Sequence, residues 1–292
     1  MRARDIVPAS PDTAPPTRLL LVDCPDRKGL IHQITGLLAA AGANIVTNAE
    51  FVDTDSGRFF MRTEFAGGEP VAALVDELRT VLPASANVRL GSAGCQRVVV
   101  LVSTEHHCLG ELLLRHAHDE LGADIQAVVS NHTALEPLTT RFNVPFHHVP
   151  HAGVSRHEHE TALKAVLAGY DPDYLVLAKY MRVLTSDFVG RYPQRIINIH
   201  HSFLPAFVGS NPYRQAFARG VKIIGATAHF VTEQLDEGPI IAQAVVPIDH
   251  SYRLEEMTRA GRDVEKIVLA KALKLVFEER VFLNGSRTIV FD

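Results

Sequence analysis

The sequence predicts an α/β protein with two domains, and three observations support this prediction. The chain has 292 residues, about twice the length of a typical domain, and 47% of them are apolar. Its first part alternates in the order βαββαβ, which is the ferredoxin-like arrangement. The remainder alternates between short apolar strands and amphipathic helices, a pattern that favours an open, mostly parallel sheet with helices on both faces.

The ferredoxin-like unit is predicted over residues 17–91, after a flexible arm at residues 1–16 that contains several prolines. Apolar residues at helical spacing indicate its helices, and β-rich runs bounded by turn residues indicate its strands. The predicted elements are a strand at 18–22, a helix at 29–41, strands at 44–53 and 58–65, a helix at 70–82 and a strand at 87–90. Gly42 can end the first helix, and the sequence Thr54-Asp55-Ser56-Gly57 suits a hairpin turn.

The second unit is predicted over residues 97–292, after a short linker at 92–96. Its first four strands are short apolar runs of the kind that parallel sheets bury, and helices fill the gaps between them. The predicted strands lie at 97–102, 125–130, 174–178, 195–199, 225–231 and 239–246, and the helices at 109–118, 134–142, 158–168 and 185–190. A long helix at 253–279 and a hairpin at 281–291 complete the unit.

Composition excludes several classes of function. The net charge is −4, so the overall charge favours neither nucleic acid nor an anionic membrane as a partner. No apolar run approaches the ~20 residues that a membrane helix needs. The cysteines Cys24, Cys95 and Cys108 are odd in number and form no C-x-x-C pair, which favours a reducing compartment. We therefore expect a soluble, cytoplasmic protein.

Fifteen histidines raise the possibility of a metal site. The tightest groups are His106-His107, His147-His148 with His151, and His157 with His159. These groups lack the H-E-x-x-H spacing of a helical zinc site and the Cys/His pairs of a structural one. We therefore expect surface or loop histidines and no metal.

The residues best suited to catalysis lie at the end of the strand at 195–199. Asn198 and His200 are two positions apart, so on an extended chain they project from the same face. An amide there could stabilise an oxyanion, and an imidazole could move a proton near neutral pH. Taken alone, this pair more commonly marks a polar strand end. A carboxylate near the imidazole would orient it and raise its basicity, and Asp236 in the loop at 232–238 is the candidate. The alternative for Asp236 is a solvated loop acid.

The N-terminal unit resembles an ACT domain in two runs, Cys24-Pro25-Asp26-Arg27-Lys28-Gly29-Leu30 and Gly42-Ala43-Asn44-Ile45. ACT domains pair with one another and bind small ligands, often amino acids. The resemblance therefore implies a homo-oligomer and a regulatory site for glycine or methionine. The residues expected to contact this effector are Asp26, Gly29, Leu30 and Asn44. The alternative is a purely structural oligomerisation module.

The second unit resembles the folate-dependent formyltransferase family. The resemblance is carried by Asn198, His200 and Asp236, with Leu204-Pro205, Gly225 and Gly238 in register. It implies a Rossmann-like doubly wound sheet and a catalytic Asn–His–Asp set that acts on the formyl group of 10-formyltetrahydrofolate. The folate-binding residues that it implies are Met181, Arg182, Val183, Leu184, Val231, Thr232, Gln234, Leu235 and Gly238.

Two further observations bear on this pocket. The alternative for Met181, Val183 and Leu184 is ordinary core. No G-x-G-x-x-G follows the first strand of the unit, so we expect no dinucleotide and no other cofactor.

Within that family, the acceptor of the formyl group remains to be identified. Residues 103–110 lack the glycines that would cradle a substrate phosphate, and Glu105 would repel one. A basic C-terminal domain for gripping RNA is also absent from the sequence, which leaves water. An ACT domain followed by this unit resembles the formyltetrahydrofolate deformylases, as do the runs at 178–182, 200–207 and 222–229. His201 stands where the transformylases usually have proline.

The resemblance implies a hydrolase that cleaves the carbon–nitrogen bond of a linear amide. Its products would be formate and tetrahydrofolate, which would supply formate for purine biosynthesis and balance one-carbon pools. Either Asp236 or His200 could act as the general base, because strongly coupled groups titrate together. Three alternatives stay open: a formyltransferase to an unidentified small amine acceptor, a ligand-sensing protein with an inactive catalytic domain, and a histidine-rich metalloenzyme.

Overall fold

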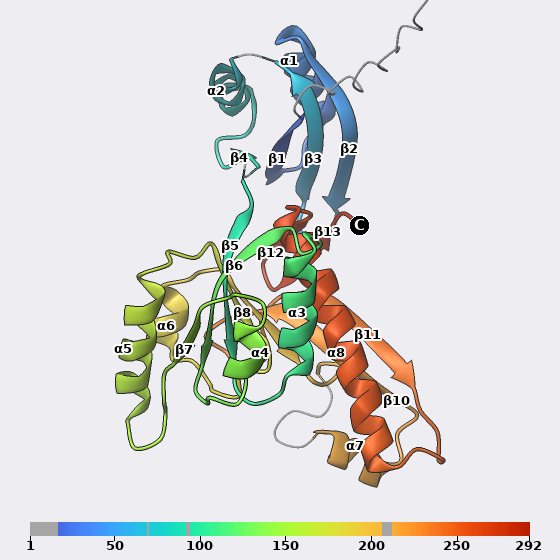
Figure 1. Cartoon of the computed structure of the whole chain (residues 1–292). Helices are drawn as coiled ribbons and strands as arrows, with labels where there is room; N and C mark the ends of the chain where they lie inside the picture. The colour runs from blue at the N-terminus through green and yellow to red at the C-terminus, as the bar shows by residue number, and fades with distance from the viewer. Residues whose placement is uncertain (1–16, 69, 92–93, 206–211) are drawn as a thin grey trace, which may run out of the picture. The chain divides into compact units, whose positions relative to one another are not determined.

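The computed structural model describes residues 17–68, 70–91, 94–205 and 212–292 (Figure 1). The chain forms two compact units that divide after residue 93. The predicted arm at residues 1–16 and the first two residues of the predicted linker lie outside the described residues. Every helix in the described ranges is too short or too polar to span a lipid bilayer.

The N-terminal unit has the predicted order of strands and helices. Its elements are β1 (Thr17–Pro25), α1 (Leu30–Ala40), β2 (Ala43–Asp53), β3 (Arg58–Gly67), α2 (Val71–Val81) and β4 (Asn87–Leu90). The four strands form an antiparallel sheet in the order β2-β3-β1-β4. This strand order confirms the ferredoxin-like arrangement.

A single apolar core holds this unit together. Leu30, Ile34 and Leu38 lie on one face of α1 at helical spacing and are at most 2% exposed. They belong to the same cluster of buried residues as Leu74 of α2 and Met61 of β3. Glycines with positive φ precede and follow α1, Gly29 at 89° and Gly42 at 77°, where a side chain would be strained. The predicted end of the first helix is therefore correct.

The C-terminal unit is built on a seven-stranded sheet in the order β11-β10-β9-β8-β5-β6-β7. Strands β5 (Gln96–Val102), β6 (Ala123–Ser130), β7 (Phe146–His148), β8 (Tyr174–Leu177) and β9 (Ile196–His200) run parallel. At one edge, β10 (Ile223–Phe230) and β11 (Ile240–Pro247) run antiparallel. The helices are α3 (His107–Ala117), α4 (Glu136–Thr140), α5 (Arg156–Leu167), α6 (Ser186–Gly190), α7 (Pro212–Arg219) and α8 (Leu254–Phe277), and β12 (Val281–Asn284) pairs with β13 (Arg287–Val290) as the predicted hairpin.

Strand β5 shows why both faces of this sheet need helices. Val98, Val100 and Val102 pack in one buried cluster with residues of α3 and α8. Val99 and Leu101, which point the other way, pack in a second cluster with residues of α5 and α6. Alternate residues of the same strand thus enter two separate cores, and the doubly wound, mostly parallel sheet is confirmed.

Three local predictions need correction. Strand β7 was missed because it is only three residues long and contains His147 and His148, which were taken for loop residues. Helix α7 was missed because it lacks an apolar stripe. Among its described side chains only Ala216 is buried. Gln96, assigned to the linker, is instead the first residue of β5, where it is paired with Ala123 of β6.

Candidate functional site

Strand β9 brings the predicted Asn198 and His200 into one cavity. The strand lies between β8 and β10. Ligands of doubly wound sheets bind beyond the carboxyl ends of the strands, so the last residues of β9 are placed to contact one. His200 is only 5% exposed, and Asn198 is partly buried. Both residues line a cavity of about 320 Å³. Because both belong to strand β9, positions 198 and 200 lie on the same face of the sheet.

Asp236 lies in the loop between β10 and β11 and faces His200. Its Oδ2 atom is 3.3 Å from Nδ1 of His200, and its side chain is 14% exposed. The hydrogen bond from His200 lowers the pKa of Asp236, so this carboxylate is ionised at neutral pH. Nδ1 of His200 therefore carries the proton. Nε2 of His200 is buried and has no hydrogen-bond partner among the described residues, which leaves its lone pair available.

His229, which the sequence did not single out, completes the polar group. The antiparallel register of β9 and β10 places it opposite Asn198. Its Nδ1 is 2.9 Å from the carbonyl oxygen of Phe230, so Nδ1 donates, and its Nε2 accepts from Nδ2 of Asn198 at 3.2 Å. Burial lowers the pKa of His229, which keeps it neutral. The sequence around His229 shows only a histidine at the end of an apolar strand. Its pairing with Asn198 depends on the register of β10 with β9, which the local sequence does not predict.

His201 stacks on His200 and is held neutral by its surroundings. The two ring centroids are 5.0 Å apart and the planes differ by 24°. Burial, followed by the charges of Lys179 and His200, lowers the pKa of His201 to about 4. His201 is therefore neutral at pH 7 and does not add a positive charge beside His200.

The cavity wall contains eight of the nine predicted folate-binding residues. These are Met181, Arg182, Val183, Leu184, Val231, Thr232, Gln234 and Leu235. The side chains of Met181 and Val183 are 58% and 47% exposed, so neither is ordinary core, and Leu235 is 60% exposed. Leu184 is partly buried and packs against the core cluster that contains Phe188. An exposed apolar surface beside a few polar groups is suited to a flat aromatic ligand.

Gly238 does not line this cavity, so its predicted contact with folate needs correction. A Cβ atom at this position would lie 1.7 Å from the carbonyl oxygen of Phe230. The same carbonyl accepts the hydrogen bond from Nδ1 of His229. Gly238 is therefore required by the close approach of two backbone segments, and it shapes the loop that holds Asp236.

The four residues predicted to bind an effector do not form one site within a single chain. Asp26 follows β1 at the end where Pro25 pairs with Arg58, whereas Asn44 pairs with Ala66, at the opposite end of β3. With ~3.3 Å per strand residue, these ends are about 26 Å apart. Leu30 is 2% exposed and belongs to the core. Only Asp26 and Gly29 remain exposed near the same loop.

The expectation that the histidines lie on the surface is wrong for His107 and His159, which are 7% and 4% exposed. His107 lies with Cys108 and Glu265, three side chains whose ligand atoms could converge on a metal ion. The Lys179 ammonium lies 3.2 Å from Glu265 and already supplies a positive charge. This cluster is better described as a buried ion pair with hydrogen bonds.

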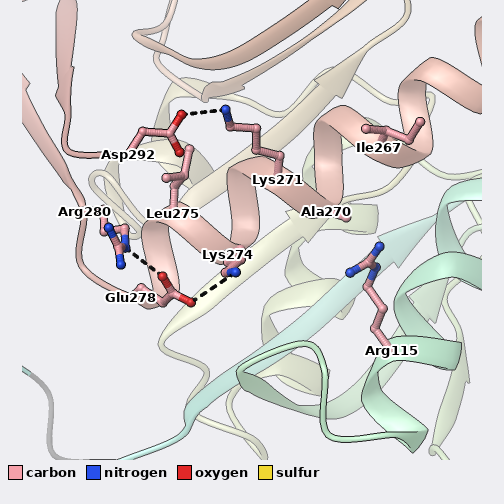
Figure 2. A pocket seen from close by; sticks show the side chains of 9 residues that line it. All are labelled: Arg115, Ile267, Ala270, Lys271, Lys274, Leu275, Glu278, Arg280 and Asp292. Atoms are coloured by element: carbon pink, nitrogen blue, oxygen red, sulfur yellow. Dashed lines mark hydrogen bonds and ion pairs between the residues drawn. The ribbon is translucent and has the colours of Figure 1, made fainter.

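A second cavity, of about 440 Å³, lies away from these residues on α3, α8 and the C-terminal segment (Figure 2). Its charged side chains are largely paired with one another. Lys271 contacts Asp292 at 2.8 Å, and Arg280 and Lys274 contact Glu278 at 2.7 and 3.9 Å. None of the predicted catalytic residues lines this second cavity. The cavity of about 320 Å³ is therefore the candidate active site, although it is the smaller of the two.

Comparison with known families agrees with the two units. A family model described as "Formyl transferase" matches residues 96–273, and one described as "ACT domain" matches residues 18–83. The chain is 53% identical to a formyltetrahydrofolate deformylase of Escherichia coli (strain K12), over 94% of this chain and 98% of that protein.

Solved structures show the same relation. A formyltetrahydrofolate deformylase from Pseudomonas syringae pv. tomato superposes with a TM-score of 0.91, at 40% identity and over 96% of both chains. A glycinamide ribonucleotide transformylase from Symbiobacterium toebii superposes with a TM-score of 0.65, at 34% identity. It covers 69% of this chain and 96% of its own.

Proposed function

Because the chain belongs to the formyltetrahydrofolate deformylase family, we propose that it hydrolyses 10-formyltetrahydrofolate to formate and tetrahydrofolate. The reaction cleaves a carbon–nitrogen bond of a linear amide, so the protein is a hydrolase. The observation that carries the proposal is the convergence of Asn198, His200 and Asp236 on one cavity.

In the proposed mechanism, His200 activates the water. Ionised Asp236 accepts a hydrogen bond from Nδ1 of His200 and fixes the tautomer in which Nε2 carries the lone pair. Nε2 then takes a proton as the water oxygen attacks the formyl carbon. Between the two candidates for general base, this geometry favours His200, because Asp236 has a lowered pKa and already faces a donor.

Asn198 stabilises the oxyanion that forms on the formyl oxygen. Its Nδ2 atom carries two hydrogens, and His229 accepts one of them at 3.2 Å. The second hydrogen is available to the oxyanion, and the bond to His229 holds the amide in that orientation. The proton on His200 finally passes to the departing N10 nitrogen of folate as the carbon–nitrogen bond breaks. These side chains supply every proton transfer, so we propose that no cofactor or metal takes part.

The folate ring is proposed to lie against the exposed apolar side chains of Met181, Val183 and Leu235, with Arg182 beside it. A hydrogen bond holds the backbone at Met181 in place, because the Met181 N–H donates to Oγ of Ser103 at 2.9 Å. Ser103 in turn donates to Oδ1 of buried Asn131 at 2.7 Å. This support fixes one wall of the cavity before a ligand enters.

A formyltransferase with an unidentified small amine acceptor is the second candidate, and it is not favoured. The relatives that match nearly the whole chain are named deformylases. The transformylase from Symbiobacterium toebii matches 69% of this chain.

We further propose that the enzyme works in the cytoplasm, where it supplies formate for purine biosynthesis. Three free cysteines, two of them buried, support a reducing compartment. The ACT domain supports a homo-oligomer and an amino-acid effector, with glycine or methionine as the candidates. An effector that limits hydrolysis would protect the one-carbon pool from being drained.

The first experiment is a turnover assay with 10-formyltetrahydrofolate and no added acceptor, in which formate and tetrahydrofolate are followed together. We expect the two products in equal amounts. Asp236→Asn should lower kcat by about 10²–10⁴, because the tautomer of His200 is no longer fixed. Thermal unfolding of the variant checks that it is folded. No formate from the wild-type protein would contradict the proposed function.

A further inference from the structure

A cluster of buried charges adjoins the catalytic cavity, and one of its members, Lys179, lines that cavity. Glu265 of α8 is fully buried, and Lys179, just after β8, is 4% exposed. Nζ of Lys179 lies 3.2 Å from Oε2 of Glu265 and 3.8 Å from Oε1 of Glu105. Glu265 is also 2.6 Å from Nε2 of His107 and accepts a hydrogen bond from the hydroxyl of Tyr213 at 2.5 Å.

Two effects oppose this arrangement: the removal of the charges from water and the strained backbone of Lys179. Removing charges from water is unfavourable unless the partners are well placed. Although burial alone would raise the pKa of Glu265, the hydrogen bond from His107 and the charge of Lys179 lower it to about 2. Lys179 also has a φ of 65°, in the left-handed region that a residue with a side chain seldom adopts. Strain of this kind is concentrated at functional sites.

The cluster lies directly beside the catalytic residues. Lys179 lines the same cavity as Asn198, His200 and Asp236. His201 connects the two groups, because its ring stacks on His200 at 5.0 Å and its centroid is 6.3 Å from that of Tyr213. Lys179 therefore borders the cavity in which the proposed reaction takes place.

We propose that Lys179 makes water the acceptor by filling a site that would otherwise receive a primary amine. A buried carboxylate close to the cavity attracts an amine, since it can hold the cationic form of the amine near the reacting group. Lys179 supplies an ammonium group that is tethered and neutralises Glu265. In this proposal the tethered ammonium group takes the position that the cation of an amine acceptor would otherwise occupy. This inference rests on the proposed function and explains how a fold shared with transformylases can favour hydrolysis.

The test removes the lysine side chain and offers methylamine in its place. Lys179→Gly opens the space, exposes the carboxylate of Glu265 to the cavity and suits the left-handed backbone. Neutral methylamine attacks the formyl carbon, a new carbon–nitrogen bond forms and the bond to N10 breaks. The proton lost by methylamine passes to N10, which gives N-methylformamide and tetrahydrofolate.

We expect Lys179→Gly to form N-methylformamide with saturation in methylamine. The ratio of N-methylformamide to formate formed by this variant should be at least about tenfold higher than the ratio formed by the wild type. Lys179→Met is the matched control, because it fills the space without a charge and should remain a hydrolase. If Lys179→Gly does not fold, Lys179→Gly with Glu265→Gln opens the same space without a buried charge. That variant should still form N-methylformamide, but without saturation.

Two outcomes would overturn the inference while leaving hydrolysis intact. One is a folded Lys179→Gly, or the double variant in its place, that releases formate and forms no N-methylformamide. The other is a wild-type enzyme that formylates methylamine as readily as the variant. Failure of the proposed function looks different, because the wild-type protein would then release no formate at all.

Discussion

At the scale of residues, the surroundings of Asp236, His229 and His201 set the protonation state of each. Asp236 stays ionised because His200 donates to it. His229 stays neutral because it is buried, with Nδ1 facing a carbonyl oxygen and Nε2 facing an amide. His201 stays neutral because it is partly buried beside the charge of Lys179. His229 and His201 therefore add no positive charge to the cavity at neutral pH.

The lowered pKa of His201 predicts a pH-dependent stability. Its folded-state pKa of about 4 lies below the ordinary 6.5, so as the pH falls the unfolded chain binds the proton first. The folded state should therefore lose stability from about pH 6.5 downward until about pH 4. Between pH 7.5 and pH 5 the loss from this one group should be about 2 kcal/mol. Urea unfolding at the two pH values measures it.

The control for this prediction is His201→Gln, which cannot be protonated in this range. The free energy of unfolding of the variant should fall by about 2 kcal/mol less than that of the wild type over the same pH interval. Equal losses in the two proteins would show that His201 is not the group responsible.

At the scale of elements, the edge of the sheet assembles the site. Strand β9 presents Asn198 and His200, and antiparallel β10 places His229 directly opposite Asn198. The loop from β10 to β11 then returns Asp236 to His200, with Asp236 at a φ of 59°. Gly238 allows this return because the backbone at Phe230 passes too close for a side chain. The loop therefore depends on a buried residue that does not line the cavity.

Gly238→Ala should damage this loop. The added Cβ would lie 1.7 Å from the carbonyl oxygen of Phe230, so one of the two backbone segments must move. We expect a loss of about 1–3 kcal/mol in the free energy of unfolding. A displaced Asp236 should also lower kcat by about 10². Chemical denaturation and the turnover assay measure the two effects.

Gly110→Ala in α3 is the matched control. A Cβ there meets no heavy atom within 4 Å, so the change should raise stability by up to about 1 kcal/mol through helix propensity and leave kcat unchanged. If Gly238→Ala behaves like Gly110→Ala, the close approach to Phe230 is not what requires a glycine.

At the scale of the whole molecule, two compact units carry separate parts of the proposed biology. The C-terminal unit holds the catalytic cavity, and the N-terminal unit matches the ACT domain model. Because Asp26 and Asn44 lie at opposite ends of the same sheet, the four predicted effector residues would need more than one chain to meet.

An effector and an oligomer are therefore linked predictions. We expect light scattering of the full chain to give a multiple of 32.0 kDa. Glycine or methionine, titrated calorimetrically to millimolar concentrations, should bind to that oligomer and lower the rate of hydrolysis. Asp236→Asn is the control, because an effector bound to the ACT domain should bind equally well when the catalytic cavity is altered. A monomeric mass, or no heat with either amino acid, would contradict this pair of proposals.

The sequence predicted the order of the main strands and helices because periodicity and turn residues report the local state of the backbone. It also predicted that Asn198 and His200 share a face, since two residues apart on a strand is a local relation. Elements with a weak local signal, β7 and α7, were missed. Eight of the nine predicted folate-binding residues line the cavity, because they fall in two continuous segments.

Contacts between distant segments were decided only by the tertiary structure. The pairing of His229 with Asn198 depends on the register of two antiparallel strands, and that of His107 with Glu265 joins residues 158 positions apart. Sequence alone determined the two α/β units and named Asn198, His200 and Asp236 as the candidate catalytic residues. It could not show that Lys179 fills the cavity wall against Glu265, because a buried ion pair depends on how helices and strands pack, and no local pattern encodes that packing.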